Sequence, residues 1–320
     1  MLLYVSLRGI SWSGVWLLVS RAAPAPLALG FLVASFSLFA RTIRWRLLLR
    51  TAGDVSITAT FAAISTGYCG NLFLPARAGE LIRMLMIHRA YGRNSGLSKA
   101  FILTTEVCER LSDAVALVLI SSVTLLMMPV RPGWFERASV PFVAIATAGF
   151  LVIALLPKLE PVFRSLLNRL PVRVDRYSKL HALTVQIIDG LRTLHNPKVL
   201  AAFVVLTGLA WFADACTVVL IMRALGLPGT LSIAFLLNTG LGLGSAVPAT
   251  PGYIGVYQFV AVSVLAPFGF SKTDAIGYIL LFQVMQYLLI SLWAALGVLI
   301  WRTKLNSAPE PVAAFEERSA

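Results

Sequence analysis

A run of 48 residues, from 224 to 271, contains no Asp, Glu, Lys or Arg. The whole chain has the same character: 58% of its 320 residues are hydrophobic and only 13% are charged. A soluble domain carries about 25% charged residues, so this chain lacks the polar side chains to cover a surface that faces water. We predict an all-α, polytopic integral membrane protein, because helices satisfy their own backbone groups in lipid.

Other uncharged runs have the length of membrane spans, since the hydrocarbon core requires about 20 largely apolar helical residues. These runs cover residues 22–40, 55–76, 114–130, 138–157, 199–213 and 275–301. Together with the 48-residue run, they predict about 6–8 transmembrane segments.

Basic residues set the orientation of these segments. Lys and Arg are enriched in cytoplasmic loops, and three segments are strongly basic. Two of them follow the runs 22–40 and 55–76, and the third, residues 158–198, holds eight basic and three acidic residues. The first of these clusters consists of Arg41, Arg44, Arg46 and Arg50, which we interpret as a cytoplasmic boundary. Short, nearly balanced loops at the other ends should face outward, at residues 131–137, 223–229 and 272–274.

This orientation predicts two re-entrant hairpins. Residues 55–80 have cytoplasmic flanks on both sides, and residues 231–268 have outward flanks on both sides, so each segment must enter, break and return. Each break contains Pro-x-x-x-Gly, at Pro75 and Pro251, which lie 176 residues apart. Paired breaks in two halves of opposite orientation point to a transporter binding site. The pair is either an inverted repeat or a short coincidence.

We assign residues 1–305 to one transmembrane domain. A stripe with tryptophans predicts an interfacial helix at residues 5–21. A leucine stripe in the loop 158–198 predicts another surface helix, which either recruits anionic lipid or packs beneath the bundle. Residues 306–320 are polar and should be disordered.

The densest polar cluster follows the first break and consists of Asn71, Pro75, Arg77, Glu80 and Arg83. Pro75 suits the first turn of a helix, and the free N–H groups of that turn would favour an anion. Arg77 could grip a phosphate with two hydrogen bonds, and Glu80 lies one helical turn from Arg77 and Arg83. Alternatively, the three charged residues form a salt-bridge ladder at the cytoplasmic rim.

A second cluster occupies one face of a predicted helix, with Glu106, Glu109, Arg110 and Asp113 at helical spacing. Charge that faces lipid is costly, so this face should point into the bundle. The cluster either pairs with the arginines of the first cluster, as a gate or proton-linked switch, or forms purely structural pairs. Asp214 is a lone acid in an apolar helix. It either marks a functional site, with an arginine as its expected partner, or makes a hydrogen bond to another helix.

The second break adds uncharged candidates for the site: Thr250, Pro251, Gly252, Gly255 and Gln258. Hydrogen bonding between helices is the favoured role of Gln258. The sequence has no Walker loop, GxSxG, HExxH or Cys/His metal spacing. We therefore expect no metal and no cofactor, and a transporter rather than an enzyme. The net charge of +13 is explained by topology and anionic lipid, not by nucleic acid.

Three motifs resemble those of the lysylphosphatidylglycerol synthase transmembrane region family, over residues 6–301. They are Asn71-x-x-Leu74-Pro75-x-Arg77-x-Gly79-Glu80-x-x-Arg83, Glu109-Arg110-x-x-Asp113 and Pro248-x-Thr250-Pro251-Gly252-x-x-Gly255. The resemblance implies the flipping of polar lipids across the bacterial inner membrane, without the aminoacyl-transfer domain of the synthases. Gln258 stands where the family usually has a glutamate, which puts a titrating acid at that position in doubt.

We therefore predict a translocase of flippase or scramblase type, whose cargo is a hopanoid, a lipid-linked sugar or a phospholipid with an anionic or phosphate-bearing headgroup. The two hairpins should meet near the midplane, with Arg77 and Arg83 on the phosphate and Glu80, Glu109 and Asp113 organising them. A lipid-modifying transferase and a scaffold of a lipid-synthesis complex are the alternatives. Further expected partners are a second copy of the chain or lipid-synthesis enzymes.

Overall fold

The structure is a computed structural model that describes residues 2–75, 77–92, 96–127, 165, 196–246 and 251–306. Within these ranges every regular element is a helix, which confirms the all-α prediction. The predicted span at 138–157, the outward loop at 131–137, nearly all of the basic loop 158–198 and all but the first residue of the tail 306–320 lie outside the described residues.

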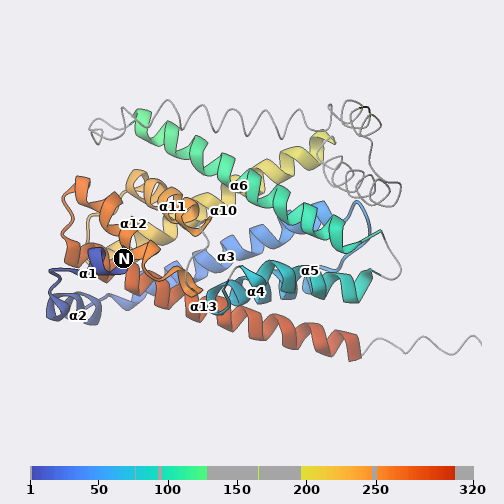
Figure 1. The fold of residues 1–320 in the computed structure, drawn as a ribbon, viewed down its shortest axis with the longest axis horizontal. Helices are drawn as coiled ribbons and strands as arrows, with labels where there is room; N and C mark the ends of the chain where they lie inside the picture. The colour runs from blue at the N-terminus through green and yellow to red at the C-terminus, as the bar shows by residue number, and fades with distance from the viewer. Residues whose placement is uncertain are drawn as a thin grey trace, which may run out of the picture.

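Four long helices form the frame: α3 (Pro24–Leu49), α6 (Lys99–Met127), α10 (Pro197–Ala224) and α13 (Lys272–Asn306). At about 1.5 Å per residue, each is longer than the roughly 30 Å of a hydrocarbon core. They all extend along the long axis of the molecule, and α3 packs along α10 (Figure 1). Among the described residues, five segments are long and apolar enough to cross a membrane, the fifth being Pro251–Phe268. The chain is therefore a multi-pass membrane protein.

The first predicted hairpin is formed by α4 (Ile57–Phe73) and α5 (Ala78–Tyr91), which pack against each other. Both of its outer ends lie at the end of the molecule where α3 finishes (Figure 1). Pro75 does not start a helix as predicted, because the chain must first reverse direction. The reversal is completed at Arg77, whose backbone is left-handed with φ 55°, and α5 begins at the next residue.

The second predicted hairpin enters from the opposite end of the molecule (Figure 1). It consists of α11 (Leu231–Ala246), the short 3-10 helix η2 (Pro251–Tyr253), α12 (Val256–Leu265) and η3 (Ala266–Phe268). Positive φ angles at Gly252, Tyr253 and Gly255, of 67°, 59° and 92°, break the helical path. The segment that is long enough to span is therefore a broken limb of the hairpin, not a continuous helix.

The segment predicted as one interfacial helix, residues 5–21, is largely helical but is not continuous. The segment forms two helices, α1 (Leu2–Leu7) and α2 (Trp12–Ser20), separated at Gly9 with φ 78°. The Oγ of Ser11 accepts a hydrogen bond from the Gly14 N–H at 3.1 Å and so caps α2. Within the bundle, α1 packs on α12 and α2 on α13.

The order of the elements is the same in both halves, and their direction is opposite. α3 runs toward the predicted cytoplasmic end, is followed by the hairpin α4–α5, and α6 returns (Figure 1). α10 runs away from that end, is followed by the hairpin α11–α12, and α13 returns (Figure 1). This is the arrangement that an inverted repeat requires.

The close packing of the first hairpin depends on Gly79. A Cβ atom at this position would overlap the carbonyl oxygen of Gly67 on α4 and lie 2.6 Å from the Oδ1 of Asn71. We therefore expect Gly79→Ala to destabilise the protein by about 1–3 kcal/mol through overpacking, measured by SDS-induced unfolding in mixed micelles. Gly208→Ala on α10 is the control, because a Cβ there meets no atom within 4 Å. Equal stability of the two variants would contradict this account of the hairpin.

Candidate functional site

A buried ion network joins the two halves, and its centre is Arg44 on α3. Its Nη1 donates to Asp113 Oδ1 at 2.6 Å, and its Nη2 donates to Glu109 Oε1 at 2.9 Å. The Arg44 side chain is 0% exposed and Glu109 is 1% exposed. A buried charge is tolerated when it is paired and hydrogen-bonded, and this geometry satisfies that condition.

The network extends to α10 and α5. Arg41 donates to Asp214 Oδ2 at 2.6 Å, which confirms that the lone acid pairs with an arginine. Arg83 donates to Glu109 Oε2 at 2.9 Å, and its guanidinium lies 4.0 Å from the ring centre of Trp45. One network of ion pairs therefore holds α3, α5, α6 and α10 together.

Three arginines differ from their predicted roles: Arg83, Arg41 and Arg44. Arg83 was expected on a phosphate, but its side chain is 0% exposed and is enclosed by Glu109, Glu106 and Trp45. Arg41 and Arg44 were interpreted only as a cytoplasmic boundary, yet both are buried ion-pair partners. An arginine cluster at a helix end has the same sequence pattern in either situation.

The tips of the two hairpins meet, as the sequence predicts. Nη2 of Arg77, at the first tip, donates to the carbonyl oxygen of Ser245, at the end of α11. Glu80 lies 3.8 Å from Nη1 of Arg77 and accepts a hydrogen bond from Nε of Arg110 at 3.2 Å. Arg77 and Arg110 thus share the carboxylate of Glu80 beside the contact of the tips.

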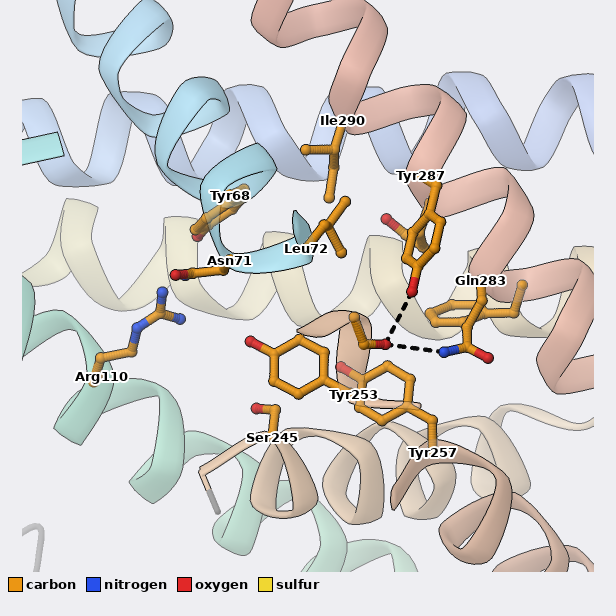
Figure 2. A pocket seen from close by; sticks show the side chains of 13 residues that line it. Tyr68, Asn71, Leu72, Arg110, Ser245, Tyr253, Tyr257, Gln283, Tyr287 and Ile290 are labelled. Carbon is orange, nitrogen blue, oxygen red and sulfur yellow. Dashed lines mark hydrogen bonds between the residues drawn. The ribbon is translucent and has the colours of Figure 1, made fainter. Parts of the chain in front are cut away.

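A cavity of about 190 Å³ lies between the tips, α6 and α13. Arg110 is the one charged residue among its described lining residues. Arg110 and Asn71 lie on one side of the cavity, and Gln283 and Tyr287 lie on the other (Figure 2). The uncharged polar lining is dominated by tyrosines and amides: Tyr68, Tyr253, Tyr257, Tyr287, Asn71, Gln283 and Gln286.

Hydrogen bonds from side chains hold the broken backbone beside this cavity. Gln258 accepts from the Gly255 N–H at 2.7 Å and donates to Gln283 at 2.6 Å, which confirms its predicted role between helices. Gln283 Nε2 and the Tyr287 hydroxyl both donate to the carbonyl oxygen of Gly252, at 3.0 and 3.1 Å (Figure 2). These two backbone groups of the break, the Gly255 N–H and the Gly252 carbonyl, are therefore satisfied by protein side chains, as broken helices in a membrane require.

At the first tip, Asn71 takes the place that the sequence assigned to an anion. Its Oδ1 accepts the Gly79 N–H in the first turn of α5 at 3.0 Å. One of the free N–H groups that would attract an anion is thus already bonded. The positive groups next to the cavity are instead the guanidinium groups of Arg110 and Arg77.

The predicted site residues that the structure describes fall into four groups. Asn71, Arg110 and Gly252 line the cavity, and Arg77, Glu80, Gly255 and Gln258 support it. Pro75 and Pro251 are exposed at the tips. Arg83, Glu109, Asp113 and Asp214 belong to the ion network. Thr250 lies outside the described residues.

The tyrosines that line the cavity are not among the predicted site residues. Tyr68 lies on α4 one turn before Asn71, and Tyr253 and Tyr257 lie within one turn of Gly255. Their nearness to the two breaks was a usable signal, since residues beside broken helices line the space between them. Tyr287 had no comparable signal, because it belongs to the continuous helix α13.

The lysylphosphatidylglycerol synthase TM region family matches residues 1–294. A protein named glycosyltransferase AglD from Haloferax volcanii is 26% identical over 280 residues, which cover 77% of this chain and 44% of that protein. The UPF0104 membrane protein MJ1078 from Methanocaldococcus jannaschii is 21% identical over 241 residues, 75% of this chain and 97% of that protein. The chain thus spans less than half of the first relative. No solved structure matches the chain.

The ion network predicts a large difference between two arginines of the same helix end. Arg44→Ala removes a buried guanidinium that pairs with both Asp113 and Glu109. Only Arg41, at 3.4 Å from Asp113, and Arg83, at 2.9 Å from Glu109, then remain as their cationic partners, so we expect a loss of about 3–5 kcal/mol in unfolding free energy. Arg50→Ala is the control, since Arg50 is 54% exposed and pairs with the exposed Asp54 at 3.6 Å, where about 0–1 kcal/mol is typical. Equal SDS-unfolding free energies would contradict the structural role of Arg44.

Proposed function

Since this chain belongs to the lysylphosphatidylglycerol synthase TM region family, we propose that it is a lipid translocase of the bacterial inner membrane. The lipid's phosphate-bearing headgroup enters the cavity between the hairpin tips. Its hydrophobic tail stays in the bilayer, where it needs no polar contact. The inverted order of the two halves supports this proposal, because broken helices at the interface of inverted halves commonly form transport sites.

The observation that carries the proposal is the charge beside the cavity. Arg77 and Arg110 share one carboxylate at ion-pair distance, that of Glu80. Nε of Arg110 is bonded to Glu80, while Arg110 still lines the cavity. Guanidinium binds phosphate with paired hydrogen bonds, and the surplus positive charge favours an anionic group.

Movement of the headgroup requires the contact between the tips to open. Arg77 takes part both in that contact, through Ser245, and in the charge cluster, through Glu80. A phosphate that binds Arg77 would compete with the carbonyl oxygen of Ser245 for the same guanidinium. Binding of the headgroup and separation of the tips are therefore coupled through one side chain, and the two halves can rock about the cavity.

Substitution of the two rim arginines tests this function. We expect Arg110→Gln and Arg77→Asn each to slow lipid movement at least about tenfold, because a hydrogen bond to a charged group contributes about 1.5–3 kcal/mol. Asparagine is chosen at residue 77 because it tolerates left-handed backbone, so the turn is kept. The measurement is the initial rate at which acyl-labelled phosphatidylglycerol crosses the bilayer of proteoliposomes.

The control is Arg46→Gln, which removes a partly exposed arginine in the last turn of α3, away from the hairpin tips and paired with Asp54 at 3.2 Å. It should leave the rate within twofold of the unchanged protein. All variants are first shown to be folded by gel filtration and thermal unfolding. Unchanged rates in folded Arg110→Gln and Arg77→Asn would exclude the cavity as the headgroup site.

A second candidate function is favoured by the similarity to a protein named glycosyltransferase AglD. In that case the cavity would hold the acceptor lipid while a group is transferred to it. Purified protein incubated with lipid and an activated sugar donor would then form a product that mass spectrometry detects. If the protein forms a product and Arg110→Gln abolishes it, the function is group transfer and not translocation. If lipid moves across the bilayer without a donor, translocation is favoured.

A further inference from the structure

We infer that the cavity selects phosphate lipids whose headgroup is an uncharged polyol, such as glycerol, inositol or a sugar, over lipids that carry an amine or aminoacyl group. This inference rests on the proposed function and names the class of its cargo. It is carried by the charges, the unpartnered hydroxyls and the ring geometry of the residues between the tips.

The charges of the cavity disfavour an ammonium group. None of its described lining residues is an Asp or a Glu, and Arg110 contributes a positive charge. The carboxylate of Glu80 is already bonded to the Arg110 guanidinium at 3.2 Å. An amine in the cavity would therefore meet a like charge without a carboxylate to compensate it, in surroundings where unpaired charge is costly.

The uncharged groups of the cavity suit hydroxyls. Tyr68, Tyr253 and Tyr257 have hydroxyl groups without a hydrogen bond to any other described residue, and the amide of Gln286 is in the same situation. Phenol and amide groups both donate and accept, as the hydroxyls of a polyol do. Such a headgroup can satisfy these groups and, through its phosphate, the guanidinium of Arg110.

A group of tyrosines can also bind an ammonium, when several ring faces surround it. The rings here are not arranged in that way. Tyr253 and Tyr257 are stacked on each other, with centroids 5.0 Å apart and planes 11° apart, so one face of each is covered. Tyr68 already lies near two guanidiniums, those of Arg83 at 5.8 Å and Arg110 at 5.7 Å. The tyrosines therefore offer hydroxyls and not an open aromatic cage.

The test compares headgroups on identical acyl chains. Proteoliposomes containing the full chain are assayed with acyl-labelled phosphatidylglycerol, phosphatidylinositol, phosphatidylethanolamine and lysylphosphatidylglycerol. We expect the two polyol lipids to cross at least tenfold faster than the two amine lipids. Equal or faster movement of the amine lipids would overturn the inference and leave translocation itself intact. If no lipid moves, translocation fails, and native mass spectrometry with the same four lipids decides the preference by binding.

A substitution at Gln286 tests whether the headgroup preference can be reversed. Gln286→Glu adds one carboxylate to the cavity without a change in size, and should shift the ratio of amine to polyol transport at least tenfold toward the amine lipids. Gln286→Met is the matched control, since it removes the amide without adding charge and should not shift the ratio toward amines. An unchanged ratio of amine to polyol transport in a folded Gln286→Glu protein would show that the side chains of the cavity do not determine which headgroup is transported.

Discussion

The pairing of Arg44 with Asp113 and Glu109 is the interaction on which the rest of the structure depends. The Arg44 guanidinium is 0% exposed, so it has no water to compensate its charge, and each carboxylate must lie within hydrogen-bond distance. This condition fixes which face of α6 meets α3. Arg41 extends the condition to α10 through Asp214, and Arg83 extends it to α5 through Glu109. The rotation of four helices is thereby set by few side chains.

The two hairpins pack within this frame, and they are subject to a different constraint. Where a helix is broken in lipid, its backbone N–H and C=O groups need hydrogen-bond partners that water does not supply. Protein groups satisfy each break locally, with Asn71 on the Gly79 N–H and Gln258 on the Gly255 N–H. The amide of Gln283 and the phenol of Tyr287, both on α13, bind the carbonyl oxygen of Gly252. Because these are uncharged partners, the polar site forms at membrane depth without a further buried ion. The frame carries most of the buried charge, and the tips carry the polar cavity.

The hairpins could be predicted because the uneven distribution of Lys and Arg between loops and the positions of the Gly/Pro breaks can both be read directly from the sequence. Together they imply that each segment returns to the side from which it entered. The sequence also predicted that Asp214 needs an arginine and that Glu109 joins the first cluster, because an unpaired acid in lipid is too costly. It did not identify Arg41 as the partner, since sequence spacing says nothing of which helices become neighbours. For the same reason, Tyr287 could not be predicted as a cavity residue. It reaches the cavity only because α13 packs beside α4.

The division of charge explains why the cavity favours an anion in a protein whose buried charges balance. In the described part of the chain, the ion network sets Arg41, Arg44 and Arg83 against four acids: Glu106, Glu109, Asp113 and Asp214. At the rim, Arg77 and Arg110 share one acid, Glu80. The two groups together contain five basic and five acidic residues, but the additional acid is buried between helices while the additional guanidinium borders the cavity. This separation of acidic from basic groups is what favours an anionic group in the cavity.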